Sequence, residues 1–112
     1  MTSAAPTLDT TFHALASPVR RAVVERLGRG PATVTELAEP FDLALPTLLQ
    51  HLRVLEKGGV VASHKRGRVR TYRIRPERLR RAASWLEKQR EVWEKRLDQL
   101  DSYAMYLENS DD

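Results

Sequence analysis

Residues 33–75, TVTELAEPFDLALPTLLQHLRVLEKGGVVASHKRGRVRTYRIR, decide the fold of this 112-residue chain. The first part, 33–57, predicts two helices separated by a tight turn. The second part, 59–75, predicts a hairpin whose loop is Lys65-Arg66-Gly67-Arg68. A helix-turn-helix followed by a basic hairpin is typical of proteins that read DNA.

Thr33 and Glu36 match a capping box, in which each side chain bonds the other residue's backbone N–H. The short helix that follows is expected to turn Leu37, Ala38 and Phe41 inward. The next helix is predicted over residues 44–57, with Pro46 tolerated in its first turn. Ala44 has no capping oxygen, so Asp42 and an earlier start are the alternative. The predicted buried stripe of this helix is Leu45, Leu48, Leu52 and Leu55.

Two strands are predicted on either side of Gly67, over residues 60–65 and 68–75. Alternation along the second strand places Tyr72 and Ile74 on the core face, and Arg73 and Arg75 on the other. Upstream of this stretch, Leu8, Phe12 and Leu15 recur at helical spacing. Ser17-Pro18 predicts the N-cap and first residue of a second helix. This helix is expected to stop at residues 28–31. Residues 1–7 are expected to be a flexible leader.

The last helix is predicted over residues 76–107, where an apolar residue recurs every seven positions. Thirty-two helical residues span roughly 48 Å, too long for a small domain to cover. The seam therefore favours packing against a second copy of the chain. Residues 108–112 are expected to form a frayed tail. The seam residues are Leu79, Leu86, Trp93, Leu100 and Leu107.

The net charge of +4 is concentrated in one segment. Residues 64–81 hold nine basic side chains and one acid, Glu77, whereas residues 82–112 hold four bases and eight acids. Such focused positive charge indicates a polyanionic partner.

Several function classes are disfavoured. The chain has no cysteine, no Gly-rich phosphate loop and no paired carboxylates in an apolar setting, so we expect neither an enzyme nor catalytic residues. No apolar run approaches a membrane span, and the N-terminus lacks the features of a signal peptide. We therefore expect a cytoplasmic protein without a membrane partner. A winged-helix module that binds a protein partner or RNA is the alternative to a DNA-binding regulator.

The chain resembles the arsenic-repressor (ArsR/SmtB-type) family of winged helix-turn-helix transcriptional regulators over residues 8–107. Four segments in this order carry the resemblance: FHALASPVRR (12–21), TELA (35–38), HLRVLE (51–56) and GRVRTY (67–72). The resemblance implies a mainly α fold with a small β-hairpin, in which 33–57 is the helix-turn-helix, 59–75 the wing and 76–107 the dimerisation helix. It also implies a homodimer, usually a repressor, on double-stranded DNA with an inverted-repeat operator.

On this resemblance, Thr47, Gln50 and His51 lie nearest to the base edges. Arg53 and Lys57 meet phosphates, and the wing residues Lys65, Arg66, Arg68 and Arg70 position without specifying. The family commonly has serine where this chain has Ala44 and Leu49. Leu49 is expected to thicken the core or to contact a thymine methyl. The expected dimer interface comprises Leu8, Phe12, Leu79, Leu86, Trp93, Leu97, Leu100 and Leu107.

Founding members of the family sense metals through cysteine pairs or through Asp, His and Glu clusters on the last helix. Residues 33–37 hold no cysteine, and the last helix holds no histidine. His13, His51 and His64 fall on three different elements, as a partly buried helix residue, a groove or core-edge residue and a wing-strand residue. We therefore expect no metal and no cofactor. An unknown small-molecule effector, or none, is left open.

Overall fold

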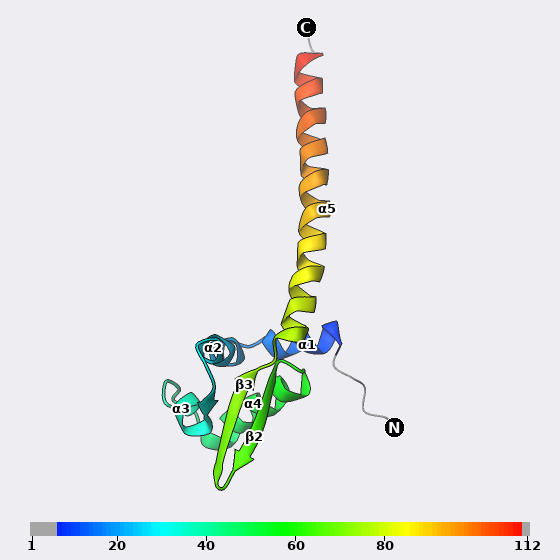
Figure 1. Ribbon diagram of the computed structural model, residues 1–112. Coiled ribbons are helices and arrows are strands. Elements are labelled where there is room, and N and C mark those ends of the chain that lie inside the picture. Colours follow the sequence, from blue (N-terminus) through cyan, green and yellow to red (C-terminus); the bar gives the residue numbers. More distant parts are fainter. Residues whose placement is uncertain (1–6, 111–112) are drawn as a thin grey trace. The chain divides into compact units, whose positions relative to one another are not determined.

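The computed structural model describes residues 7–110, and the expected leader over residues 1–6 and the last two residues lie outside this range. The elements follow the predicted order, with one additional strand (Figure 1). Thr7, which we had assigned to the leader, caps the first helix. The elements are α1 (Leu8–Leu15), α2 (Pro18–Leu27), β1 (Ala32–Thr33), α3 (Val34–Ala38), α4 (Leu45–Lys57), β2 (Val61–Arg66), β3 (Val69–Ile74) and α5 (Pro76–Asn109).

The chain divides into two compact units at the boundary between Ala82 and Ala83. The first unit contains α1 to β3 and the first turns of α5, and we call it the winged unit. The second unit consists of the rest of α5, from Ala83 onward, and we call it the seam unit. α5 ends at Asn109, two residues later than predicted, so the start of the expected frayed tail is helical.

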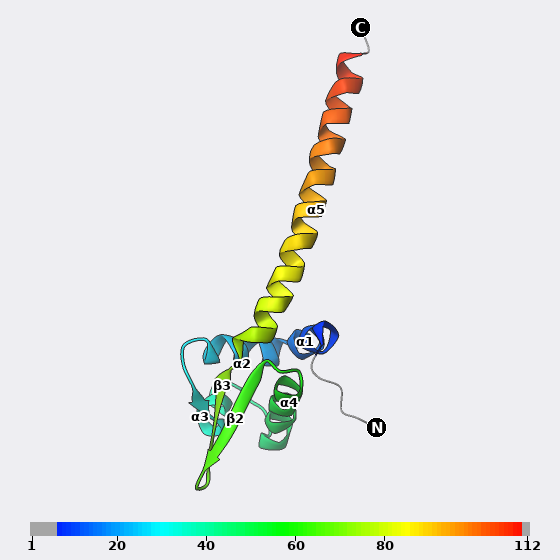
Figure 2. The same ribbon diagram turned by 45° about the vertical axis from the view of Figure 1, so that its right-hand side comes forward.

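The sheet of the winged unit has three antiparallel strands in the order β1-β3-β2. Figure 2 shows β2 and β3 side by side. β2 and β3 form the predicted hairpin, in which Val61 pairs with Ile74 and Arg66 with Val69. β1 was not predicted: it consists of Ala32 and Thr33 and pairs with Tyr72 and Thr71. Two residues are too few to show an alternating pattern. β1 joins the segment between α2 and α3 to the wing.

The core of the winged unit is formed by α1, α2, α3, α4 and the sheet. Leu48, Leu52 and Leu55 of α4 are at most 1% exposed, as the predicted stripe requires. The prediction for Leu45 was wrong, because Leu45 is the first residue of α4 and its side chain is 53% exposed. Leu49 and Val54 are partly buried against the core.

The first helix differs from its predicted pattern. Thr11 and Ala14 form its buried face, whereas Leu8, Phe12 and Leu15 are half-buried. The Thr11 hydroxyl is satisfied because it donates to the carbonyl oxygen of Thr7 at 3.0 Å. Small residues on this face allow the end of α4 to approach closely, and a Cβ on Gly58 would lie 2.9 Å from the Cβ of Ala14. This contact excludes any larger residue at position 58.

The predicted helix starts are confirmed, and α4 begins within one residue of its predicted start at Ala44. Ser17 caps α2 with Pro18 at the first position, and Thr33 and Glu36 form the capping box of α3. The N-cap of α4 is Ala44, without a side-chain hydrogen bond. The alternative start at Asp42 was therefore wrong. The first N–H groups of α4 consequently have no side-chain cap from their own N-terminal residue.

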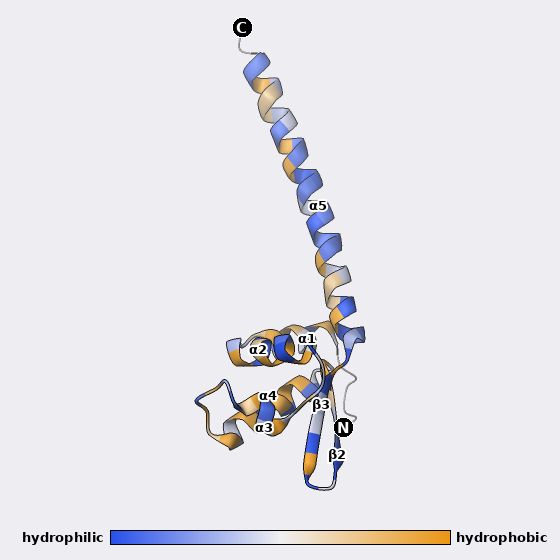
Figure 3. Cartoon of the chain, turned by 60° about the vertical axis from the view of Figure 1, so that its left-hand side comes forward, coloured by the Kyte–Doolittle hydropathy of each residue, from blue (hydrophilic) through white to orange (hydrophobic). Residues whose placement is uncertain are grey.

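The seam unit has no buried residue among those that the structure describes. Hydrophobic residues nevertheless recur along it between hydrophilic ones (Figure 3). Trp93 is 70% exposed, Leu100 is 63% exposed and Leu86 is 50% exposed. No helix within residues 7–110 is long and apolar enough to cross a membrane.

Candidate nucleic-acid interface

The side of α4 opposite the core carries four of the five residues of this helix that the sequence assigned to DNA contact. Thr47, Gln50, Arg53 and Lys57 are all exposed. They recur at spacings of three and four residues, so they lie along one face of the helix. This exposed strip holds one amide, one hydroxyl and two cations. An amide can bond an adenine edge through two hydrogen bonds, and the cations suit phosphates.

The wing presents the second group of predicted residues. Lys65, Arg66, Arg68 and Arg70 are exposed at the end of the hairpin formed by β2 and β3. Gly67 lies in the turn with a φ of 64°, a conformation that a residue with a side chain adopts only with strain. The turn therefore depends on glycine, and it holds the surrounding basic side chains together.

Arg70 belongs to a chain of hydrogen bonds between the wing and α4. Its Nη1 donates to Ser63 Oγ at 2.8 Å, and Ser63 Oγ donates to Glu56 Oε2 at 3.0 Å. Burial raises the pKa of the neighbouring Tyr72 hydroxyl, and the negative charge of Glu56 adds to this effect. Ser63 thus links the wing to α4 through Glu56, and Arg70 extends this link across the hairpin at the surface, a role that the sequence did not indicate.

His51 lies at the edge of the core rather than on the exposed strip. It is half-buried, and its Nδ1 is 3.1 Å from Nη1 of Arg20 on α2. The same Arg20 donates through Nε to the carbonyl oxygen of Ala14 at 2.7 Å and through Nη2 to that of His13 at 3.1 Å. Sequence reasoning missed Arg20. Its only signal was its place in the segment shared with the ArsR/SmtB-type family.

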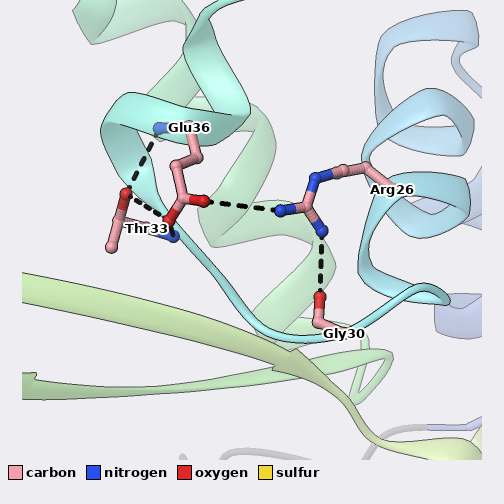
Figure 4. Close-up of polar contacts among 4 residues, drawn as sticks. All are labelled: Arg26, Gly30, Thr33 and Glu36. Carbon is pink, nitrogen blue, oxygen red and sulfur yellow. Dashed lines mark hydrogen bonds and ion pairs between the residues drawn. The ribbon is translucent and has the colours of Figure 1, made fainter.

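The turn before α3 is held by a second arginine (Figure 4). Arg26 Nη1 donates to the carbonyl oxygen of Gly30 at 3.1 Å, and its Nη2 is 3.5 Å from Glu36 Oε2. The backbone and hydroxyl hydrogen bonds from Thr33 lower the pKa of Glu36, with a smaller contribution from the charge of Arg26. These contacts connect α2 to the start of the helix-turn-helix.

The structure does not bring the three histidines together. His13 is exposed on α1, not partly buried as predicted, and His64 is exposed on β2. Among residues 7–110, no group of three or more His, Asp or Glu side chains is arranged to hold a metal ion. Leu79, which the sequence assigned to the dimer interface, packs against the core of its own winged unit.

Comparison with known proteins agrees with this geometry. A family profile described as a helix-turn-helix domain matches residues 15–64. The crystal structure of an ArsR family transcriptional regulator is 53% identical, with a TM-score of 0.74, and the match covers 78% of this chain and 90% of that one. A winged helix-turn-helix protein that binds regulatory DNA is therefore the class that fold and surface define. The chain belongs to the ArsR family of transcriptional regulators.

Two further relatives are informative. The transcriptional regulator Rv2034 of Mycobacterium tuberculosis is 41% identical over 71 residues, which are 63% of this chain and 66% of that regulator. The solution structure of the homodimeric winged helix-turn-helix DNA-binding domain of Mb0332 from Mycobacterium bovis is 25% identical, with a TM-score of 0.58. That match covers 81% of this chain and 82% of the Mb0332 domain.

Proposed function

We propose that the chain is a homodimeric repressor that binds an inverted-repeat operator in double-stranded DNA. The observation that carries this proposal is the exposed strip of α4, formed by Thr47, Gln50, Arg53 and Lys57, beside a wing with four exposed cations. α4 enters the major groove, where Thr47 and Gln50 meet base edges. Arg53 and Lys57 contact phosphates, and the wing follows the backbone.

The wing residues contribute unequally. The exposed side chains of Lys65, Arg66 and Arg68 make no hydrogen bond or ion pair with another residue within 7–110, so their charges are available to phosphates. Arg70 bonds Ser63 on the neighbouring strand, and Ser63 bonds Glu56 of α4, so part of the Arg70 side chain is already engaged within the protein. His51 lies between the exposed strip of α4 and the core, where it pairs with Arg20.

The seam unit supplies the dimer interface. Leu86, Trp93, Leu100 and Leu107 repeat every seven residues and are 45% to 70% exposed. Leu97 adds to the same seam and is 57% exposed. Isolated helices expose such a stripe to water at considerable cost, so a second copy is the natural cover. The homodimer described for the Mb0332 domain supports this assembly. Leu8 and Phe12 of α1 stay predicted members of the interface, whereas Leu79 packs against the core of its own winged unit.

Repression follows from occupancy, because a dimer seated on a promoter excludes polymerase without any further contact. We infer a regulatory and not a catalytic role, exerted in the cytoplasm where the DNA is, without metal or cofactor. Any small-molecule effector is of unknown chemistry.

Selection of bound duplexes from a random DNA pool tests the proposal. The expected product is an inverted repeat with half-sites about one helical turn apart, bound by two protomers. Gel-shift titration of that duplex at two salt concentrations should show a steep loss of affinity as salt rises. Equal affinity for random duplex would contradict sequence-specific reading, and preferential capture of RNA would favour the alternative module.

A further inference from the structure

Arg20 occupies a junction between three helices of the winged unit. It lies in the first turn of α2, where its backbone N–H donates to Ser17 Oγ at 3.3 Å. Its guanidinium turns back to the carboxyl end of α1, where it bonds the carbonyl oxygens of His13 and Ala14. A helix leaves its last carbonyl groups without partners, so a cation there is stabilising. Arg20, which belongs to α2, thus caps the carboxyl end of α1.

The third contact of the guanidinium reaches the recognition helix. Nη1 of Arg20 is 3.1 Å from Nδ1 of His51. A guanidinium has five N–H donors and no acceptor, so Nδ1 must be the acceptor in this contact. A ring whose Nδ1 accepts is uncharged and carries its single proton on Nε2. The Arg20 contact therefore fits the tautomer of His51 that carries its proton on Nε2.

His51 is adjacent to the exposed strip of α4. It directly follows Gln50 and lies one helical turn after Thr47, while Leu48 and Leu52 beside it are fully buried. The rotation of α4 about its own axis is thereby constrained on the core side by leucines and at the core edge by the Arg20 contact. A rotation error would displace Gln50 from a base edge.

We propose that Arg20 is a positioning residue for DNA reading, which acts by holding His51 as the neutral Nε2–H form and so setting the orientation of α4. The proposal rests on the proposed function of α4. The planar fork of arginine fits two carbonyl oxygens and one ring nitrogen together, which the single ammonium of lysine does not. Arg20 touches no DNA in this role.

The protonation state of His51 is measurable in the free protein. Imidazole nitrogen NMR spectra of the full chain, labelled at histidine, should show His51 with an unprotonated, hydrogen-bonded Nδ1 and a protonated Nε2 at neutral pH. The His51 signals are assigned by their absence in His51→Asn. A proton on Nδ1, or a charged ring, would overturn the proposal. The unmodified chain decides this point even where a variant fails to fold.

Arg21 provides a matched control for the effect on DNA. Its Nη1 donates to the carbonyl oxygen of Leu15 at 2.9 Å, so it also closes the end of α1, but it is not paired with His51. Arg20→Met should weaken binding to the selected duplex about tenfold, the loss typical of one hydrogen bond from a charged donor. Arg21→Met should leave binding nearly unchanged. Equal losses would show that both arginines are merely structural.

A double-mutant cycle separates action through His51 from other effects of Arg20. In a His51→Leu background, Arg20→Met should cause a clearly smaller further loss of DNA affinity, since its partner is already absent. Full additivity would overturn the proposal. If the unmodified chain showed no sequence-specific binding, the proposed function would fail while the NMR result still stood. If the NMR spectra showed the His51 proton on Nδ1 while sequence-specific DNA binding was intact, this inference alone would fail.

Discussion

The winged unit and the seam unit use hydrophobic residues in opposite ways. Every buried hydrophobic side chain within residues 7–110 belongs to the winged unit, from Ala14 to Ala82. The seam unit instead exposes large apolar side chains, including Trp93 and Leu100. The winged unit therefore has a core of its own, whereas the seam unit leaves its apolar side chains uncovered, and the proposed second copy of the chain would cover them.

The largest effect is expected from a charge in the seam. Trp93→Glu should convert the dimer to a monomer, because it places a carboxylate in the middle of the apolar stripe. Light scattering coupled to size exclusion measures the change, and the circular dichroism signal of the winged unit should persist. Lys88→Glu is the matched control, since it introduces the same group on the same helix outside the seven-residue repeat. If the unmodified chain were a monomer, the proposed packing of the seam unit against a second copy would be wrong.

Truncating a core side chain should destabilise the winged unit. Leu52 is fully buried in α4, so Leu52→Ala should lower the free energy of unfolding by about 2–5 kcal/mol. Leu45→Ala removes the same atoms from a side chain that is 53% exposed and should cost far less. Chemical denaturation of both variants gives the two values. Similar losses would mean that Leu45 is covered in the assembled protein.

Substitutions on the exposed strip of α4 and on the wing should leave both the stability and the assembly of the protein intact. Gln50→Ala should relax base preference at a cost of about 1–3 kcal/mol if the amide bonds an adenine edge twice. Arg68→Ala should weaken all duplexes alike and reduce the slope of log affinity against log salt by about one. Gel shifts with matched and mismatched duplexes distinguish the two. The division into specifying and positioning residues fails if both variants act uniformly.

The smallest effect is expected at Glu36, which is exposed. Its pKa is lowered in the folded chain, mainly by hydrogen bonds from Thr33, so its contribution to stability is present above the ordinary glutamate pKa and is lost as pH falls through the folded value. Glu36→Gln should therefore lower the melting temperature slightly at neutral pH. The difference from the unmodified chain should vanish in acid. A difference that persists in acid would assign the effect to packing.

Local patterns predicted most of the winged unit, because caps, breakers and periodicity act over a few residues. Ser17-Pro18, the box of Thr33 and Glu36, and the hairpin around Gly67 were all found where expected. The errors concern relations between elements. Leu45 fits the helical stripe but lies beyond the core, and β1 exists only because β3 is beside it.

The class of protein, the order of its helices and hairpin, and the concentration of charge on the wing could be predicted from residue type and short spacing, which the chain carries before it folds. The bond from Arg70 to Ser63 and the pairing of Arg20 with His51, 31 positions away, could not be predicted in this way. A hydrogen bond between distant residues depends on the direction of two side chains, and the packing of the helices sets that direction.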